Sequence, residues 1–177
     1  MRIILRTLFV LTLIALCAVA YLAAYYYWPV KEIPSGVQAD RLEVYKAARR
    51  LNLYAADELL ASYQVAFGFN PLGDKQCQGD GRTPEGKYVI DYHNAQSSCY
   101  KSLHISYPDA NDRREATARG CSPGGDIMIH GMVNGKGWIG RFHRHGDWTH
   151  GCIAMTNAEM DQLWGTVPDG TPIEIFP

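Results

Sequence analysis

The segment Thr149-His150-Gly151-Cys152-Ile153-Ala154-Met155, with Ile129-His130-Gly131 upstream of it, carries the strongest indication of fold and function in this chain. A thiolate is a good nucleophile, and a histidine at the end of an apolar strand is well placed to accept the thiol proton. Gly151 lets the backbone approach a substrate closely, and the N–H groups of Gly151 and Cys152 are candidate donors to an oxyanion. The pattern predicts a cysteine acyl-transfer site with Cys152 as nucleophile and His130 as base.

Two other interpretations of these residues exist. A cysteine between glycine and isoleucine is often only a small buried apolar side chain. The second is a zinc or copper site, for which a strand would place His143 and His145 on one face, close to His150 and Cys152. We expect neither a metal nor another cofactor, because Asp147 is the only carboxylate close to these ligands in the sequence.

The N-terminal region has the pattern of a membrane segment. Thr7 to Trp28 is a run of 22 residues without a charge, about 33 Å long as a helix and so long enough to span a bilayer core. Arg2 and Arg6 precede it and should stay in the cytoplasm, which places the chain after Pro29 outside. We expect an uncleaved anchor, and a removed signal peptide with a cleavage site at Ala18-Val19-Ala20 is the alternative.

We expect residues 1–28 to form the anchor, 29–40 a linker and 41–177 one domain of ordinary size. Without Arg2 and Arg6, 15 basic residues face 18 acidic ones, so the domain is near −3 and shows no basic excess for nucleic acid. Its oligomeric state cannot be predicted. Outside the membrane, one disulfide could form within the set Cys77, Cys99 and Cys121, and the sequence leaves all three pairings open.

The polar–apolar alternation of the domain predicts a mainly β fold with one or two short helices. A polar stretch at 109–119 is at best a short surface helix, and Thr156-x-x-Glu159 is a capping box that opens a helix through about Trp164. A long loop is expected at 68–86. Strands are predicted at 41–45, 51–54, 60–67, 87–92, 102–106, 126–129, 153–155 and 171–176.

Thr149-His150-Gly151-Cys152, downstream of His130-Gly131, resembles the [Ser/Thr]-His-Gly-Cys signature of the L,D-transpeptidase (YkuD) catalytic domain. The resemblance extends over roughly residues 40–177. Three further segments that match the family are Gly79–Gly86, Leu103–Pro108 and Gly124–Gly131.

The resemblance implies a β-sandwich-like catalytic fold and a cysteine acyltransferase that acts on peptidoglycan stem peptides in cell-wall biogenesis and cell shape. Cys152 would attack the carbonyl of a stem-peptide residue and expel the terminal D-alanine, with His130 as base, oriented through a backbone carbonyl near Gly131. The acyl group would pass to another stem peptide or to a lipoprotein lysine. The protein would sit in the bacterial inner membrane as a single-pass protein, with its catalytic domain in the periplasm.

The same resemblance implies roles for the neighbouring residues. His150 would hold the oxyanion together with the Gly151 and Cys152 N–H groups. The candidate substrate contacts are Trp148, Thr149, Arg141 and Arg144.

One position departs from the family pattern. Many members carry an arginine two residues after the cysteine, where this chain has Ala154, so its role is vacant or moves to Arg141 or Arg144. The Gly-Cys-x-Ala-Met pattern is also similar to members that hydrolyse. An L,D-endopeptidase or carboxypeptidase that uses the same Cys152 and His130 is therefore the alternative, and a non-enzymatic exported metal- or wall-binding domain is a third.

Overall fold

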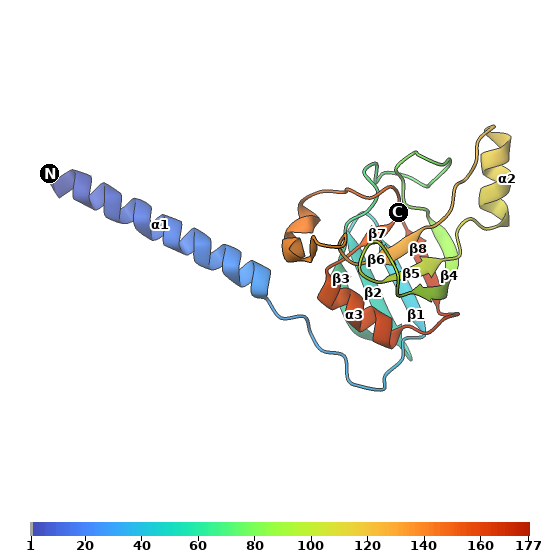
Figure 1. Cartoon of the computed structure of the whole chain (residues 1–177), viewed down its shortest axis with the longest axis horizontal. Coiled ribbons are helices and arrows are strands. Elements are labelled where there is room, and N and C mark those ends of the chain that lie inside the picture. The colour runs from blue at the N-terminus through green and yellow to red at the C-terminus, as the bar shows by residue number, and fades with distance from the viewer. Residues whose placement is uncertain (1) are drawn as a thin grey trace. The chain divides into compact units, whose positions relative to one another are not determined.

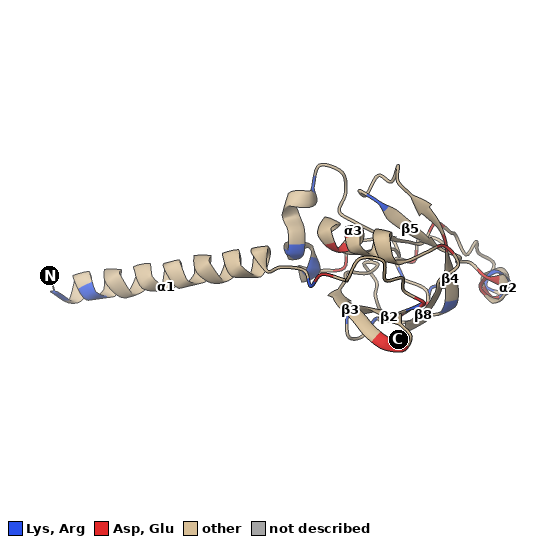
Figure 2. Cartoon of the chain, turned by 90° about the horizontal axis from the view of Figure 1, so that it is seen from below, with Lys and Arg blue, Asp and Glu red and all other residues tan. Residues whose placement is uncertain are grey.

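The computed structural model describes residues 2–177, which divide into two compact units, one up to Val30 and one from Lys31 to Pro177 (Figure 1). The first contains helix α1 (Arg2–Tyr27), whose residues bury no side chain. Its two charges, Arg2 and Arg6, lie near its N-terminal end (Figure 2). The helix has the length and composition of a membrane span, properties that a membrane anchor and a signal sequence share.

The second unit is built on one curled sheet of eight strands in the order β3-β2-β1-β8-β4-β5-β6-β7 (Figure 1). The mainly β prediction is confirmed. The strands are β1 (Arg41–Tyr45), β2 (Arg50–Ala55), β3 (Glu58–Gln64), β4 (Gly86–Asn94), β5 (Ser102–Ile105), β6 (Met128–His130), β7 (Ile153–Ala154) and β8 (Pro172–Phe176).

Alternation along the strands explains why this sheet forms. In β1, Leu42 and Val44 are fully buried, whereas the residues between them are only partly covered, as expected for a strand with one face on the core. The sheet turns at β4, whose first half pairs with β8 and whose second half pairs with β5. The register shifts between Ile90 and Tyr92, and such an irregularity bends a strand.

Three helical segments accompany the sheet, α2 (Ala110–Ala118), the 3₁₀ helix η1 (Gly137–His145) and α3 (Asn157–Thr166). Helix α3 begins at the predicted capping box, in which Thr156 Oγ1 accepts from the Glu159 N–H and the Glu159 carboxylate accepts from the Thr156 N–H. Helix α2 agrees with the predicted surface helix. The expectation that His143 and His145 share one face of a strand is wrong, because both lie in η1, where His143 is buried and His145 is exposed.

The segment after β3 brings the long loop to the site. The predicted strand 60–67 ends early, at Gln64, and the chain then makes isolated bridges, Ala66 with Ala154 and Gly68 with Thr149. The loop itself is tied to the segment after α2 by a disulfide between Cys77 and Cys121. Cys99 is a free, half-buried thiol.

Candidate active site

Two short parallel strands hold the candidate nucleophile and base. Strand β6 ends at His130, and β7 begins directly after Cys152. The register pairs Ile129 with Ile153 and His130 with Ala154. Since side chains alternate along strands, Cys152 lies opposite Met128 and on the same face as His130, two positions away.

The Cys152 thiol is half-buried and held by backbone groups. Met128 N–H donates to Cys152 Sγ over 3.4 Å, and the thiol in turn donates to Asp126 O over 3.6 Å. Burial raises the pKa of Cys152, and the Met128 N–H opposes this only in part. The resting side chain is therefore a neutral thiol at neutral pH.

His130 is buried, with 6% of its surface exposed. Its Nδ1 lies 2.6 Å from the carbonyl oxygen of Gly131, and because a carbonyl only accepts, Nδ1 must carry the proton. Burial lowers the pKa of His130, against the effect of that hydrogen bond. The ring is thus neutral, with its Nε2 lone pair available to receive a proton.

Within residues 2–177, no hydrogen bond joins Cys152 to His130. Both pKa shifts favour the uncharged forms. The resting site therefore holds a thiol and an imidazole on one face of the sheet rather than a thiolate–imidazolium ion pair.

A tight turn presents Cys152. Thr149 Oγ1 donates to Cys152 O over 2.7 Å and accepts from the Gly151 N–H over 3.1 Å. Gly151 has φ +131°, and a Cβ there would lie 2.6 Å from Arg82 O, so only glycine fits. The Gly151 N–H is used inside this turn, which leaves the Cys152 N–H as the better candidate of the two for an oxyanion.

Buried contacts fix the segment that leads to this turn. Trp148 and Thr149 donate their N–H groups to Phe67 O. Asp147 accepts from the Phe67 N–H and pairs with Arg49, and its side chain is 5% exposed. Asp147 thus anchors the loop before the cysteine, a role that its sequence position alone did not indicate.

The remaining predicted site residues differ in what they contact. Trp148 packs edge-on against His130, with ring centroids 5.7 Å apart, so it borders the site. His150 is exposed and packs against Phe69. Arg144 pairs with the buried Glu159, so its charge is used inside the domain. Arg141 lies on η1.

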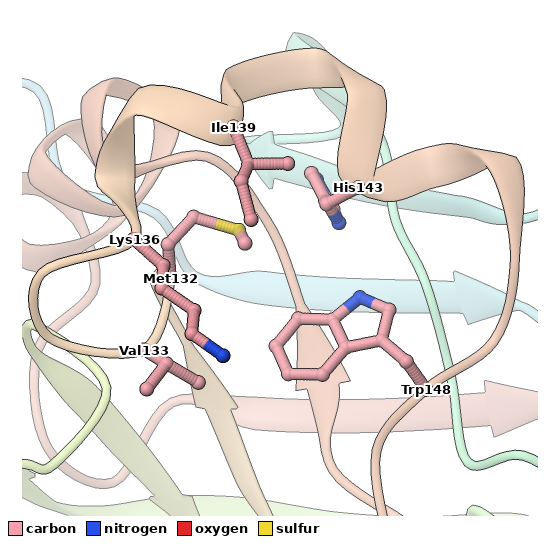
Figure 3. A pocket seen from close by; sticks show the side chains of 6 residues that line it. All are labelled: Met132, Val133, Lys136, Ile139, His143 and Trp148. Carbon is pink, nitrogen blue, oxygen red and sulfur yellow. The ribbon is translucent and has the colours of Figure 1, made fainter.

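The structure also shows a cavity of about 190 Å³ that sequence reasoning missed. It lies next to Trp148, and its other lining residues come from η1 and the segment after β6 (Figure 3). The signal that could have found it is the presence of apolar residues, Met132, Val133 and Ile139, in the otherwise polar and glycine-rich stretch between the two motifs. The lining residues are Met132, Val133, Lys136, Ile139, His143 and Trp148.

The alternative metal site finds no support in the geometry. Among the described residues, 2–177, no group of three or more His, Cys, Asp or Glu side chains is arranged to hold a metal ion. Two of the proposed ligands have different surroundings. His143 lines the cavity beside Trp148, whereas the Cys152 thiol forms hydrogen bonds with the backbone of Met128 and Asp126.

The fold is a mainly β domain in which Cys152 and His130 lie at two neighbouring strands, β7 and β6. The family model described as the L,D-transpeptidase catalytic domain (YkuD) matches residues 39–175. This chain belongs to that family.

The relatives agree with this assignment. The putative L,D-transpeptidase YafK of Escherichia coli strain K12 is 32% identical over 149 residues, which cover 77% of this chain and 53% of the relative. The chain thus spans about half the length of the curated relatives that it matches.

Solved structures share the fold. The helical cell shape determining protein Pgp2 from Campylobacter jejuni has a TM-score of 0.59 at 21% identity and covers 79% of this chain and 48% of its own. Bd1075 from Bdellovibrio bacteriovorus has a TM-score of 0.57 at 22% identity, over 83% of this chain and 50% of that one. An L,D-transpeptidase from Mycobacterium smegmatis has a TM-score of 0.53 at 12% identity, over 78% and 59%.

Proposed function

We propose that this protein is an envelope enzyme that modifies peptidoglycan stem peptides by acyl transfer through Cys152. The observation that carries the proposal is the position of Cys152, directly before β7, next to the neighbouring strand β6 that ends at His130, inside a domain of the L,D-transpeptidase family. Helix α1 would hold the domain at the membrane, as a single-pass anchor with the domain in the periplasm.

The first half-reaction follows from the hydrogen bonds at the site. With Nδ1–H bound to Gly131 O, His130 Nε2 takes the thiol proton as Cys152 Sγ attacks the peptide carbonyl carbon. The Cys152 N–H is the candidate donor to the oxyanion. The C–N bond then breaks, the proton on His130 passes to the departing amine, and a thioester remains on Cys152.

The second half-reaction returns the thiol. An amine of a second stem peptide attacks the thioester carbonyl, gives its proton to His130 Nε2, and forms a new amide as the thiolate leaves and is reprotonated. Water would react by the same steps and release a carboxylic acid. Transfer to an amine is the proposed reaction, and hydrolysis at the same residues is the second candidate, favoured by the absence of the family arginine at Ala154.

The test uses the full-length chain in detergent micelles with purified disaccharide tetrapeptides, and mass spectrometry of the products. Wild-type protein is expected to release the terminal amino acid and to join two peptides into a dimer. Cys152→Ser should lower product formation by at least about 10³-fold. Cys17→Ser, the same substitution in helix α1, should leave the rate unchanged.

The outcomes separate the hypotheses. Dimers support transfer, and shortened monomers alone support hydrolysis. A Cys152→Ser variant that keeps wild-type turnover would overturn the assignment of the nucleophile. A wild-type protein that binds the peptides without converting them would indicate a binding domain.

A further inference from the structure

A second histidine, His104, lies near the candidate nucleophile on the sheet. Strands β4, β5, β6 and β7 lie side by side in that order (Figure 1). The register of β5 and β6 pairs His104 with Met128, and the N–H of Met128 donates to Cys152 Sγ on the other side of β6. Neighbouring strands are about 4.8 Å apart, so the Cα atoms of His104 and Cys152 are about 10 Å apart, with only Met128 between them.

The two side chains are directed to the same face of the sheet. Leu103 and Ile153, which are next to His104 and Cys152 in the sequence, are fully buried. Side chains alternate along a strand, so the imidazole of His104 and the thiol of Cys152 are directed to the face opposite this core. Both residues are half-buried there. A ligand on this face can therefore meet His104 and an acyl group on Cys152.

An irregularity in β4 gives His104 a carboxylate partner. The register pairs Ile90 with Ile105 and Tyr92 with His104, so Asp91 is the extra residue of a β-bulge. Asp91 Oδ1 lies 2.5 Å from His104 Nδ1, and the Tyr92 ring stacks on the imidazole with centroids 4.5 Å apart. Bulges re-aim side chains and are frequent next to active sites. This bulge sets two consecutive residues of β4 against one histidine.

The contacts of His104 leave it in the form of a base. A carboxylate only accepts hydrogen bonds, so Nδ1 carries the proton. Nε2 then has a lone pair, and it forms no hydrogen bond with any residue in the range 2–177. The negative charge of Asp91 stabilises the imidazolium that forms when Nε2 takes a proton.

The surroundings of His104 attract a cation. Asp91 and Asp126 are both exposed. Burial has the largest effect on the pKa of Tyr92 and on that of Cys152, and the Asp126 carboxylate raises both further. Tyr92 is 41% exposed, and the face of a tyrosine ring attracts an ammonium group. These groups favour a ligand that carries an ammonium group.

Transfer to an amine requires the loss of a proton that His130 does not take. An amine such as that of lysine, with a pKa of about 10.4, is an ammonium ion at neutral pH, and it must lose one proton before its nitrogen has a lone pair for attack. The nitrogen loses a second proton after the attack, and this one passes to His130 in the proposed acyl transfer. Water loses only one proton. Transfer to an amine therefore uses one more base than hydrolysis does.

We propose that His104, held by Asp91, is the base that prepares the acceptor amine. His104 Nε2 takes one proton from the ammonium group, and the free amine then moves across Met128 and attacks the thioester carbonyl on Cys152. The imidazolium of His104 later returns the proton to solvent. The inference rests on the proposed function, because it adds a step to that reaction. It makes His104 necessary for transfer to a peptide amine and unnecessary for hydrolysis.

The test lets two acceptors compete for one thioester. The full-length chain in micelles receives the disaccharide tetrapeptide, which is both donor and amine acceptor, together with hydroxylamine, which is uncharged at neutral pH. The ratio of dimer to hydroxamate does not depend on how fast the shared thioester forms. His104→Gln should lower this ratio at least about 100-fold, as for the loss of a positioned base, while hydroxamate continues to form. Asp91→Asn should lower the ratio less than His104→Gln does.

A second histidine–carboxylate pair on β4 provides a matched control. His93 Nδ1 lies 2.5 Å from Asp169 Oδ1, and the His93 ring packs edge-on against Trp164. His93 follows Tyr92 and pairs with Leu103, so it is directed to the opposite face from His104. His93→Gln should leave the ratio of dimer to hydroxamate unchanged. A ratio that His104→Gln leaves unchanged, or that His93→Gln lowers equally, overturns the role of His104.

The two proposals fail in different ways. Dimer and hydroxamate in a ratio that does not depend on His104 keep the acyl-transfer function and overturn this base. Hydroxamate without dimer from the wild-type chain keeps the thioester on Cys152 and overturns His104 as the base for a peptide amine. A wild-type chain that forms no dimer, hydroxamate or shortened peptide overturns the function, and with it the step assigned to His104.

Discussion

The protonation state of Cys152 in the resting protein can be tested by its reactivity. The test distinguishes a thiolate–imidazolium ion pair from a neutral thiol beside a neutral imidazole. In an ion-pair site, a nearby imidazolium keeps the cysteine ionised well below neutral pH. In this protein, burial raises the pKa of Cys152 and lowers that of His130. Alkylation of Cys152 by iodoacetamide should therefore depend strongly on pH across the neutral range.

The expected size of the effect follows from the direction of the shift. An ordinary thiol with a pKa of about 8.5 is about 3% ionised at pH 7, and Cys152 should be less ionised than that. While the thiolate is the minor form, its fraction rises about tenfold per pH unit, so the alkylation rate should rise about 100-fold between pH 6 and pH 8. An ion pair with a thiol pKa of about 3–4 would give almost no change over this range.

The assay follows modification of the Cys152 peptide by mass spectrometry after quenching and proteolysis, which separates it from Cys17 and Cys99. N-acetylcysteine in the same buffers corrects for the reagent. His130→Gln should show the same steep profile, since the neutral imidazole makes no hydrogen bond to the thiol. A rise of less than about threefold between pH 6 and pH 8 in the wild-type chain would refute the neutral resting pair.

Three stability predictions follow from other contacts. Gly151→Ala should lower the free energy of unfolding by about 1–3 kcal/mol in denaturant titrations, because the glycine has a positive φ and a backbone oxygen 2.6 Å from the added Cβ. The Cys77–Cys121 disulfide joins residues that are 44 positions apart in the sequence, so its reduction should lower the free energy of unfolding by up to about 4 kcal/mol. Unchanged stability in reductant would contradict a role of this disulfide in folding. Glu159→Gln should cost about 3–5 kcal/mol because it leaves Arg144 buried without a charge partner, and melting with and without Arg144→Met shows whether that unpaired charge is the cause.

Much of the fold could be predicted because its signals are local. Alternation placed the strands at both ends of the domain, and the capping box of Thr156 and Glu159 placed the start of α3. The order of the strands could not be predicted in this way. β1 pairs in parallel with β8, over residues 42–45 and 173–176, and no local pattern specifies a pairing between segments this far apart in the chain.

The site was predictable as a set of residues but not as a chemical state. Cys152 and His130 stood out by their neighbours in sequence, whereas the direction of their pKa shifts depends on how deeply the sheet buries them. The 3₁₀ helix η1 was missed because His-x-His suggests strand alternation. Gly140, with φ 51° and ψ −134°, breaks the helical geometry within this segment, and His143 after it is buried; neither the break nor the burial can be predicted from the spacing of the two histidines.

The burial of Ala154 explains why this chain lacks the arginine that many family members carry at this position. Ala154 is fully buried, and its backbone exchanges hydrogen bonds of 2.8 and 3.0 Å with Ala66. Because the position is fully buried, a guanidinium there would lose its contact with water, at a high cost in desolvation. Arg144 cannot replace that charge, since it is paired with Glu159.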